Sequence, residues 1–241
     1  MIKINKRSAP QKLIELKERI IRKGLTPEQE YRKLKNPLKE EVRECLMKEQ
    51  GHLCAYCMRR IPDERVDGTG IPGVTLEHYI ARNAIDDSVT AGTGLGVDYH
   101  NLLAVCSGGR VSKGIYMDNE LTCDASRGNR PLSINPLAER TLETIYYKNN
   151  GEIAAKDSVI ENDLVNILNL NCVKYSSLPE GRRKTLEPIE EYIATLENED
   201  EMLDECRILL NDFEAETDPK TPYCGILIWW LKDYIKALEN M

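Results

Sequence analysis

Four cysteines between residues 54 and 123 constrain the fold of this chain more than any other feature. Cys54 and Cys57 form a Cys-x-x-Cys pair, and Cys106 and Cys123 follow at longer spacing. Zinc takes four tetrahedral ligands in structural sites, and thiolates are its usual ligands there. We therefore expect the four cysteines to bind one structural zinc ion and to bring distant parts of the chain together.

Metal binding explains the Cys-x-x-Cys pair better than redox chemistry or disulfide bonding does. No apolar run reaches the roughly 18 residues needed to span a membrane, and the first residues are basic, without the apolar core of a secretory signal. We therefore expect a cytoplasmic protein, where disulfide frameworks are rare. A thioredoxin-like pair requires a strand–helix–strand context, which we do not find around Cys54 and Cys57. We assign the four isolated cysteines to packing: Cys45, Cys172, Cys206 and Cys224.

A second group of polar residues lies between the cysteines. The run 74–78 has the pattern of a short strand and ends on Glu77 and His78. Hydrolysis of a phosphodiester needs a base to activate water and a divalent cation to stabilise charge on the phosphate. Histidine suits the first task at neutral pH, and a carboxylate with a second acid or amide suits Mg²⁺. A lone histidine here would be a core residue, but the neighbouring cysteines favour a functional site.

Four short motifs occur in a fixed order: Cys-x-x-Cys, Glu-His, Asn-Leu-Leu-x-x-Cys and Cys-Asp-x-x-Arg-Gly-Asn. Together they resemble the HNH endonucleases, whose core is a ββα-metal fold of two antiparallel strands and a helix. The resemblance implies that His78 is the general base, that Glu77 and Asp124 bind the catalytic metal, and that Asn101 orients the base through its amide. Glu77 stands where many members have aspartate, and Asp124 stands where histidine or asparagine is usual. Asn129 is the reserve ligand.

The two ends of the chain extend this resemblance to one branch of the HNH enzymes. Residues 1–4 with Pro10 and the segment 223–229 are similar to the PtuB-type nucleases, which are effectors of Septu and retron-associated anti-phage systems. This resemblance implies a partner ATPase of the PtuA type, which is ABC/SMC-like. In retron forms it also implies a reverse transcriptase with its RNA–DNA hybrid (msDNA), and a nuclease that stays silent until phage interferes.

Charge is distributed unevenly along the chain, which has a net charge of −7. Residues 1–50 carry 14 Lys/Arg against 8 Asp/Glu, whereas residues 132–241 carry 11 against 22. A basic N-terminal part can meet phosphates, and an acidic C-terminal part favours a complementary partner surface. We therefore divide the chain into a basic helical region (1–50), an HNH core with the Cys₄ zinc site (51–135), and a hairpin followed by acidic docking helices (136–241).

Periodicity predicts an α+β protein that is mostly α-helical, with the HNH core between N-terminal and C-terminal helices. A capping-box sequence at residues 26–29 starts a helix that Pro37 ends. An Asn-Asn-Gly turn predicts a hairpin over 141–156. The Gly-rich run at 92–96 lacks the strand and helix of a dinucleotide site, so we expect an ordinary loop there. We expect further helices at 10–23, 38–50, 161–168, 180–197, 201–214 and 223–238, a short helix or strand at 101–105, loops at 67–73 and 86–97, and an insertion at 107–120.

The sequence therefore predicts a nuclease. We expect hydrolysis of phosphodiester bonds in DNA or in a structured RNA such as tRNA, with Mg²⁺ or Mn²⁺ at Glu77 and Asp124 and with His78 activating water. The motif does not choose between DNA and RNA, because this chemistry needs no 2′-hydroxyl. Two alternatives stay open. One is a non-enzymatic zinc-bound adaptor that docks a defence or signalling partner, and the other is a redox protein that uses Cys54 and Cys57.

Overall fold

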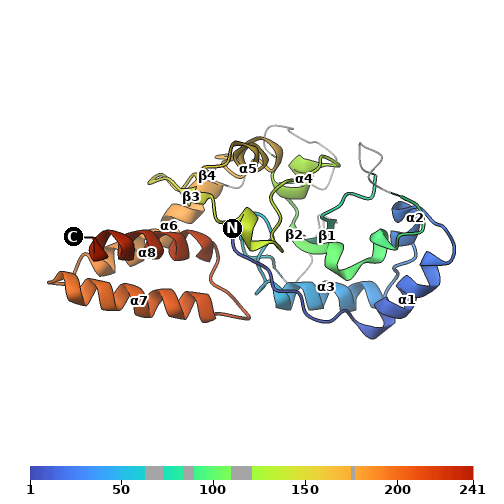
Figure 1. The fold of residues 1–241 in the computed structure, drawn as a ribbon, viewed down its shortest axis with the longest axis horizontal. Coiled ribbons are helices and arrows are strands. Elements are labelled where there is room, and N and C mark those ends of the chain that lie inside the picture. The colour runs from blue at the N-terminus through green and yellow to red at the C-terminus, as the bar shows by residue number, and fades with distance from the viewer. Residues whose placement is uncertain (63–72, 84–89, 110–120, 175–176, 241) are drawn as a thin grey trace.

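A two-stranded antiparallel ribbon lies near the centre of the molecule (Figure 1). The computed structural model describes residues 1–62, 73–83, 90–109, 121–174 and 177–240. Strand β1 (Val74–His78) pairs with strand β2 (Leu102–Cys106), so that Val74 lies opposite Cys106 and His78 lies opposite Leu102. The strand predicted at 74–78 is confirmed, and β2 is a strand rather than a helix. The register puts Cys106 at one end of the ribbon and His78 at the other.

Two helices of the N-terminal region pack beside this ribbon. Helix α1 (Gln11–Ile21) contacts helix α3 (Leu38–Glu49), and α3 packs on β2. The apolar stripe of α1 buries Leu13 and Ile20, and α3 buries Val42, Leu46 and Met47. The helices predicted at 10–23 and 38–50 are both confirmed, with bounds close to the predicted ones. The prediction was accurate because the apolar residues recur at the spacing of one helical face.

The short helix α2 (Pro27–Tyr31) lies between them in sequence. It begins with the predicted capping box, in which the Thr26 side chain accepts a hydrogen bond from Gln29 N. It ends at Tyr31, well before the predicted stop at Pro37. The helix is this short because the chain turns immediately after it, and α2 packs against the 3₁₀ turn η1 (Leu95–Val97).

Helix α4 (Cys123–Arg127) packs against β2. Cys123 N donates to Leu168 O over 2.8 Å, which attaches the helix to the π-helical turn η5 (Asp163–Ile167). A second sheet pairs β3 (Ile145–Tyr147) with β4 (Ile153–Ala155) in antiparallel fashion. The predicted hairpin is thus confirmed, but its strands are shorter than expected, and a 3₁₀ turn (η4, Glu139–Thr141) lies at the predicted start of the first one.

The C-terminal part is helical, as predicted. Figure 1 shows α7 and α8 side by side at one end of the molecule, opposite the end that holds α1. Ile193, Cys206 and Leu231 form a separate apolar cluster between the last three helices. No helix in the described part of the chain is both long enough and apolar enough to cross a lipid bilayer. The bounds of the four helices are Ser158–Asn162 (α5), Leu178–Ile193 (α6), Glu199–Ala215 (α7) and Cys224–Glu239 (α8).

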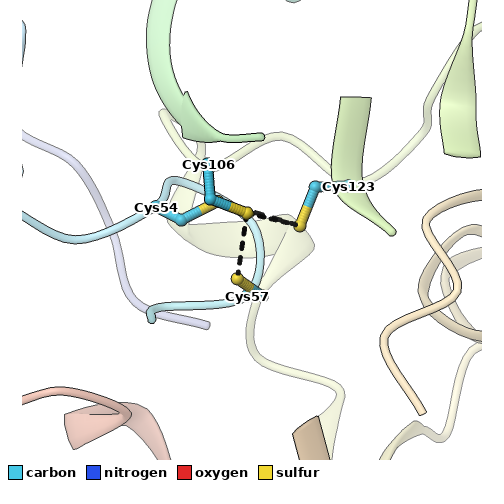
Figure 2. Close-up of side chains that lie close together, drawn as sticks. All are labelled: Cys54, Cys57, Cys106 and Cys123. Atoms are coloured by element: carbon cyan, nitrogen blue, oxygen red, sulfur yellow. Dashed lines mark hydrogen bonds between the residues drawn. The ribbon is translucent and has the colours of Figure 1, made fainter. Parts of the chain in front are cut away.

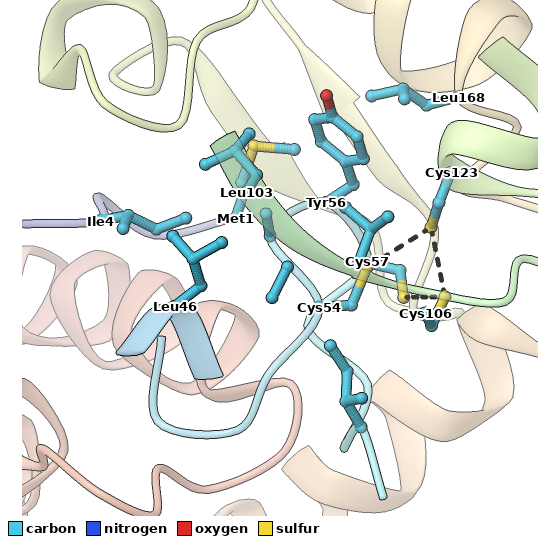
Figure 3. Packing of buried hydrophobic residues seen from close by; sticks show 14 of the residues in the cluster. Met1, Ile4, Leu46, Cys54, Tyr56, Cys57, Leu103, Cys106, Cys123 and Leu168 are labelled. Atoms are coloured by element: carbon cyan, nitrogen blue, oxygen red, sulfur yellow. Dashed lines mark hydrogen bonds between the residues drawn. The ribbon is translucent and has the colours of Figure 1, made fainter. Parts of the chain in front are cut away.

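The main hydrophobic core includes the four cysteines of the cluster (Figure 3). Met1, Leu46, Leu103 and Leu168 all belong to it, so the core takes residues from each of the three predicted regions. The division into these regions stays a prediction. Cys172, Cys206 and Cys224 are buried, as expected of packing residues, and Cys45 is half-buried against the core. The predicted loop at 67–73 and the insertion at 107–120 lie almost entirely outside the described residues, as does part of the loop at 86–97.

Candidate metal centre and carboxylate–histidine site

Three separate elements bring four thiols to one end of the ribbon. Cys54 and Cys57 lie in a tight turn after α3, which a hydrogen bond from Cys54 N to Arg59 O closes over 2.9 Å. Cys106 is the last residue of β2, and Cys123 is the first residue of α4. The strand pair, the turn and the helix therefore determine where the sulfur atoms lie.

The four sulfur atoms point toward one another (Figure 2). Sγ of Cys123 lies 3.8 Å from Sγ of Cys54 and 3.7 Å from that of Cys106, and Sγ of Cys57 lies 3.8 Å from that of Cys106. All four atoms lie within 4.8 Å of one another, and all four residues are buried. A tetrahedral zinc ion with Zn–S bonds of about 2.3 Å would separate its sulfur ligands by about 3.8 Å. The four cysteines therefore fit a metal such as zinc and could bind it.

The electrostatics of the cluster also suit a cation. Hydrogen bonds from Cys106, Cys123 and Cys54 hold the pKa of the Cys57 thiol well below its usual range, and the hydrogen bond with Cys106 raises the pKa of the Cys123 thiol. A buried thiolate is costly unless a cation lies beside it, so a metal ion would stabilise ionised sulfurs here. Within the described residues, no other group of three or more His, Cys, Asp or Glu side chains brings its possible ligand atoms this close together.

Glu77 lies at the opposite end of the ribbon and is only 7% exposed. Its carboxylate forms an ion pair with Arg127 of α4, accepts a hydrogen bond from Tyr56 Oη over 3.2 Å, and accepts another from His78 N over 3.1 Å. Arg127 is itself buried and also donates to the backbone carbonyls of His78 and Tyr79. Arg127 therefore ties α4 to the end of β1 and holds the Glu77 carboxylate in place.

Asp124 brings a second carboxyl group to Glu77. Burial, and after it the charge of Asp124, raises the pKa of Glu77 to about 8, and the two side chains share a hydrogen bond. A divalent cation beside both carboxyl groups would relieve the repulsion between their charges. The structure thus brings together the two residues that were predicted to bind the catalytic metal. Asn129, the reserve ligand, is exposed beyond the end of α4.

The imidazole of His78 is only 3% exposed. Its Nε2 lies 3.0 Å from Gly96 O, and Tyr31 lies edge-on against the ring with 4.8 Å between the ring centroids. A carbonyl oxygen only accepts hydrogen bonds, so Nε2 carries the proton and Nδ1 holds the lone pair. Burial lowers the pKa of His78 to about 4, so the ring is neutral near pH 7. A neutral ring in a fixed tautomer can accept a proton at Nδ1.

Asn101 acts on a different group from the one predicted. Its Oδ1 accepts a hydrogen bond from Ile80 N over 2.7 Å, and its Nδ2 donates to Ile80 O and Leu95 O, each over 3.1 Å. Both amide hydrogens are used by carbonyl oxygens, so the expected direct contact with the ring of His78 is replaced by contacts with the backbone. Asn101 therefore holds the end of β1 and the loop that carries Gly96.

The chain matches no known protein-family model and no curated protein sequence. Sequence reasoning gave no role to Arg127 or to Glu30, whose carboxylate binds the loop beside His78. Arg127 could have been found, because it stands three residues after Asp124, on the same face of one helix. Glu30 carried no such signal, since its contacts depend on how distant segments pack.

Proposed function

We propose that this chain is a metal-dependent HNH endonuclease, with zinc at the four cysteines and Mg²⁺ or Mn²⁺ at Glu77 and Asp124. The observation that carries the proposal is the pair of carboxyl groups of Glu77 and Asp124, with the neutral His78 next to Glu77 in the strand, where two antiparallel strands meet a helix. The order of β1, β2 and α4 matches the strand–strand–helix order that the resemblance to HNH enzymes implies. This agreement supports the proposal because the elements carry the expected residue types at the expected positions.

The side chains of this site divide the reaction between them. His78 would take a proton at Nδ1 from a water molecule as the water oxygen attacks phosphorus, and the bond from phosphorus to the leaving oxygen would break. Glu77 and Asp124 would hold the divalent cation, which stabilises charge on the phosphate and on the leaving oxygen when bound. The cysteine centre fixes the start of α4 and therefore the position of Asp124, which directly follows Cys123.

The proposed substrate is nucleic acid, either DNA or tRNA. The guanidinium of Arg82 lies 4.4 Å from the centroid of the Tyr31 ring and Lys39 Nζ lies 5.0 Å from it, while Tyr31 touches His78. These cations lie close to the proposed base, where they can meet phosphates that flank the cut. A PtuA-type ATPase, with a reverse transcriptase and msDNA in a retron, belongs to the proposal through the resemblance. The acidic C-terminal helices suit a basic docking surface.

The burial of Glu77 and His78 favours a second candidate function, a non-enzymatic zinc-bound adaptor. In this function the cysteines hold the fold, the polar residues only pack, and the acidic helices bind a partner. It predicts no cleavage by the wild-type chain with any divalent metal, with or without its partner. It also predicts that replacing Asp124 changes only stability.

A cleavage assay separates the two candidates. Plasmid DNA and total tRNA would be offered separately to the zinc-loaded chain in Mg²⁺ or Mn²⁺, with EDTA as a control, and again with the candidate ATPase present. The nuclease proposal predicts metal-dependent cutting of one substrate, and cutting by Asp124→Ala that is slower by about 100-fold or more. The control variant Glu44→Ala, on the exposed surface of α3, should cut like wild type. Undiminished cutting by Asp124→Ala would refute the metal site, and no cutting in any mixture would favour the adaptor.

A further inference from the structure

A buried glutamate of helix α2 binds the loop that contacts the histidine. Glu30 is completely buried. Its Oε1 accepts a hydrogen bond from Gly94 N and its Oε2 accepts one from Gly96 N, each over 2.9 Å. Hydrogen bonds to an ionised carboxylate are stronger than those between neutral groups, and a buried carboxylate without such donors would be strongly unfavourable. Each oxygen of the Glu30 carboxylate therefore accepts a hydrogen bond from one backbone amide, and the two amides lie two residues apart in the loop.

The loop is built for this close approach to α2. A Cβ atom at Gly96 would lie 2.0 Å from Pro27 O and 2.8 Å from Glu30 Cβ, so only glycine fits there. Asn101 holds the residue between the two bound amides, because its Nδ2 donates to Leu95 O. Side chains from two distant parts of the sequence thus fix three consecutive residues of the loop.

The loop presents the carbonyl that binds the imidazole, since Gly96 O lies 3.0 Å from Nε2 of His78. Tyr31, the neighbour of Glu30, lies edge-on against the same ring. Helix α2 therefore contacts His78 directly through Tyr31 and indirectly through Glu30 and Gly96. We infer that Glu30 is a positioning residue that fixes the Gly96 carbonyl and, through it, the orientation and the tautomer of His78. This inference rests on the proposed function, in which His78 is the base.

Arg32 provides a comparison at the end of the same helix. Its guanidinium pairs with Glu28 over 3.1 Å, so it also stabilises α2 through charge. Arg32 lies at the surface, whereas the partners of Glu30 are amides of the loop that binds His78. A glutamine at either position removes one of these interactions. The two variants therefore separate positioning of the ring from stability of the helix.

The ¹⁵N NMR signals of the histidine rings test the inference without cleavage, and the chain has only three histidines to assign. In Glu30→Gln one acceptor becomes an amide that faces a backbone N–H, so the loop loses a hydrogen bond. The zinc-loaded wild type and Arg32→Gln should show one tautomer of His78, with the proton on Nε2. Glu30→Gln should show a mixture of both tautomers. A single unchanged tautomer in folded Glu30→Gln would overturn the inference.

Cleavage kinetics give a second readout. Glu30→Gln should lower kcat by about tenfold or more and change KM by less than about twofold, because ring geometry affects the chemical step rather than substrate binding. Arg32→Gln should stay within about twofold of wild type in kcat. An equal loss in both variants would assign the effect to helix stability and overturn the inference. If wild type cleaves nothing, the proposed function fails, while the tautomer measurement still decides whether Glu30 positions His78.

Hydrogen exchange in the wild-type chain covers the case in which Glu30→Gln does not fold. The amides of Gly94 and Gly96 should be protected together with the Nε2 hydrogen of His78, because one set of contacts holds all three. A Gly96 amide that exchanges as fast as that of the exposed Gly24 would overturn the inference.

Discussion

The two ends of the β1–β2 ribbon are held in different ways. At the Cys106 end, four thiols from three elements contact one another directly, and the cluster is complete in itself. At the His78 end, each polar group is held by a buried side chain from elsewhere in the chain, including Arg127 and Glu30. In the cysteine cluster the four thiols contact one another, whereas the groups of the carboxylate–histidine site depend on side chains from elsewhere in the chain.

The two ends are also linked through helix α4. Cys123 and Asp124 are consecutive residues at the start of this helix, and Arg127 lies one turn later. Fixing Cys123 in the cysteine cluster therefore fixes the carboxyl group that lies beside Glu77 at the other end. The comparison predicts that damage to the cysteine centre spreads to both sites, whereas damage to the carboxylate–histidine site leaves the bound metal in place.

The largest effect is expected from Cys57→Ser. Loss of one thiolate should abolish tight zinc binding and leave the chain largely unfolded, because structural zinc contributes roughly 10 kcal/mol or more to folding in small zinc domains. Metal analysis and circular dichroism would measure both losses. Cys206→Ser is the control, since Cys206 is equally buried but lies in the apolar cluster of the C-terminal helices. A full equivalent of zinc in folded Cys57→Ser would refute the four-cysteine site.

The next largest effect is expected from Arg127→Met. At about pH 9, above the raised pKa of Glu77, this change leaves the buried carboxylate without its cation, which should lower the free energy of unfolding by about 3–5 kcal/mol while zinc is retained. Urea unfolding would measure the loss. The double variant Arg127→Met, Glu77→Leu should recover most of it, because the unpaired charge is gone. Arg183→Met, which breaks exposed ion pairs on α6, should cost less than about 1 kcal/mol. A cost that small for Arg127→Met would contradict the account.

A pH-dependent effect is expected from Lys6, whose Nζ donates to the carbonyl of Leu102, the residue opposite His78. Burial lowers the pKa of Lys6 to about 8, below its value in the unfolded chain. Between about pH 8 and about pH 10 the unfolded chain therefore binds more protons, and wild-type stability should rise by about 2 kcal/mol through this residue. Urea unfolding across this range should show that Lys6→Met lacks this rise. If the free energies of unfolding of the two proteins changed with pH in the same way, the prediction would be wrong.

The smallest effect is expected from Thr26→Ala. The change removes the capping box at the start of α2, and loss of such a cap costs about 1 kcal/mol. Since α2 carries Glu30 and Tyr31, hydrogen exchange at Gly94 and Gly96 should become faster while zinc content stays the same. Exchange that changes equally near the cysteine cluster would show that the two ends of the ribbon are not held separately.

Local patterns in the sequence were sufficient to predict the α+β class, the capping box of α2, strand β1, the hairpin and the clustering of the four cysteines. Each is encoded by neighbouring residues or by a residue type with one dominant use. The Gly-rich run at 92–96 shows where this reasoning ends, because it was expected to be an ordinary loop. Its role follows from contacts with Glu30 and His78, which are distant in sequence. The backbone contacts of Asn101 were missed for the same reason.

The most direct test of the account is the cleavage rate of His78→Ala, measured on the same preparation as its zinc content. Because His78 belongs to the site proposed for chemistry and not to the cysteine centre, the variant should keep a full equivalent of zinc and its fold. Its cleavage of the substrate that wild type cuts should fall by about 100-fold or more, since loss of a general base typically removes that much. Cleavage within about twofold of wild type by a folded, zinc-loaded His78→Ala would contradict the account.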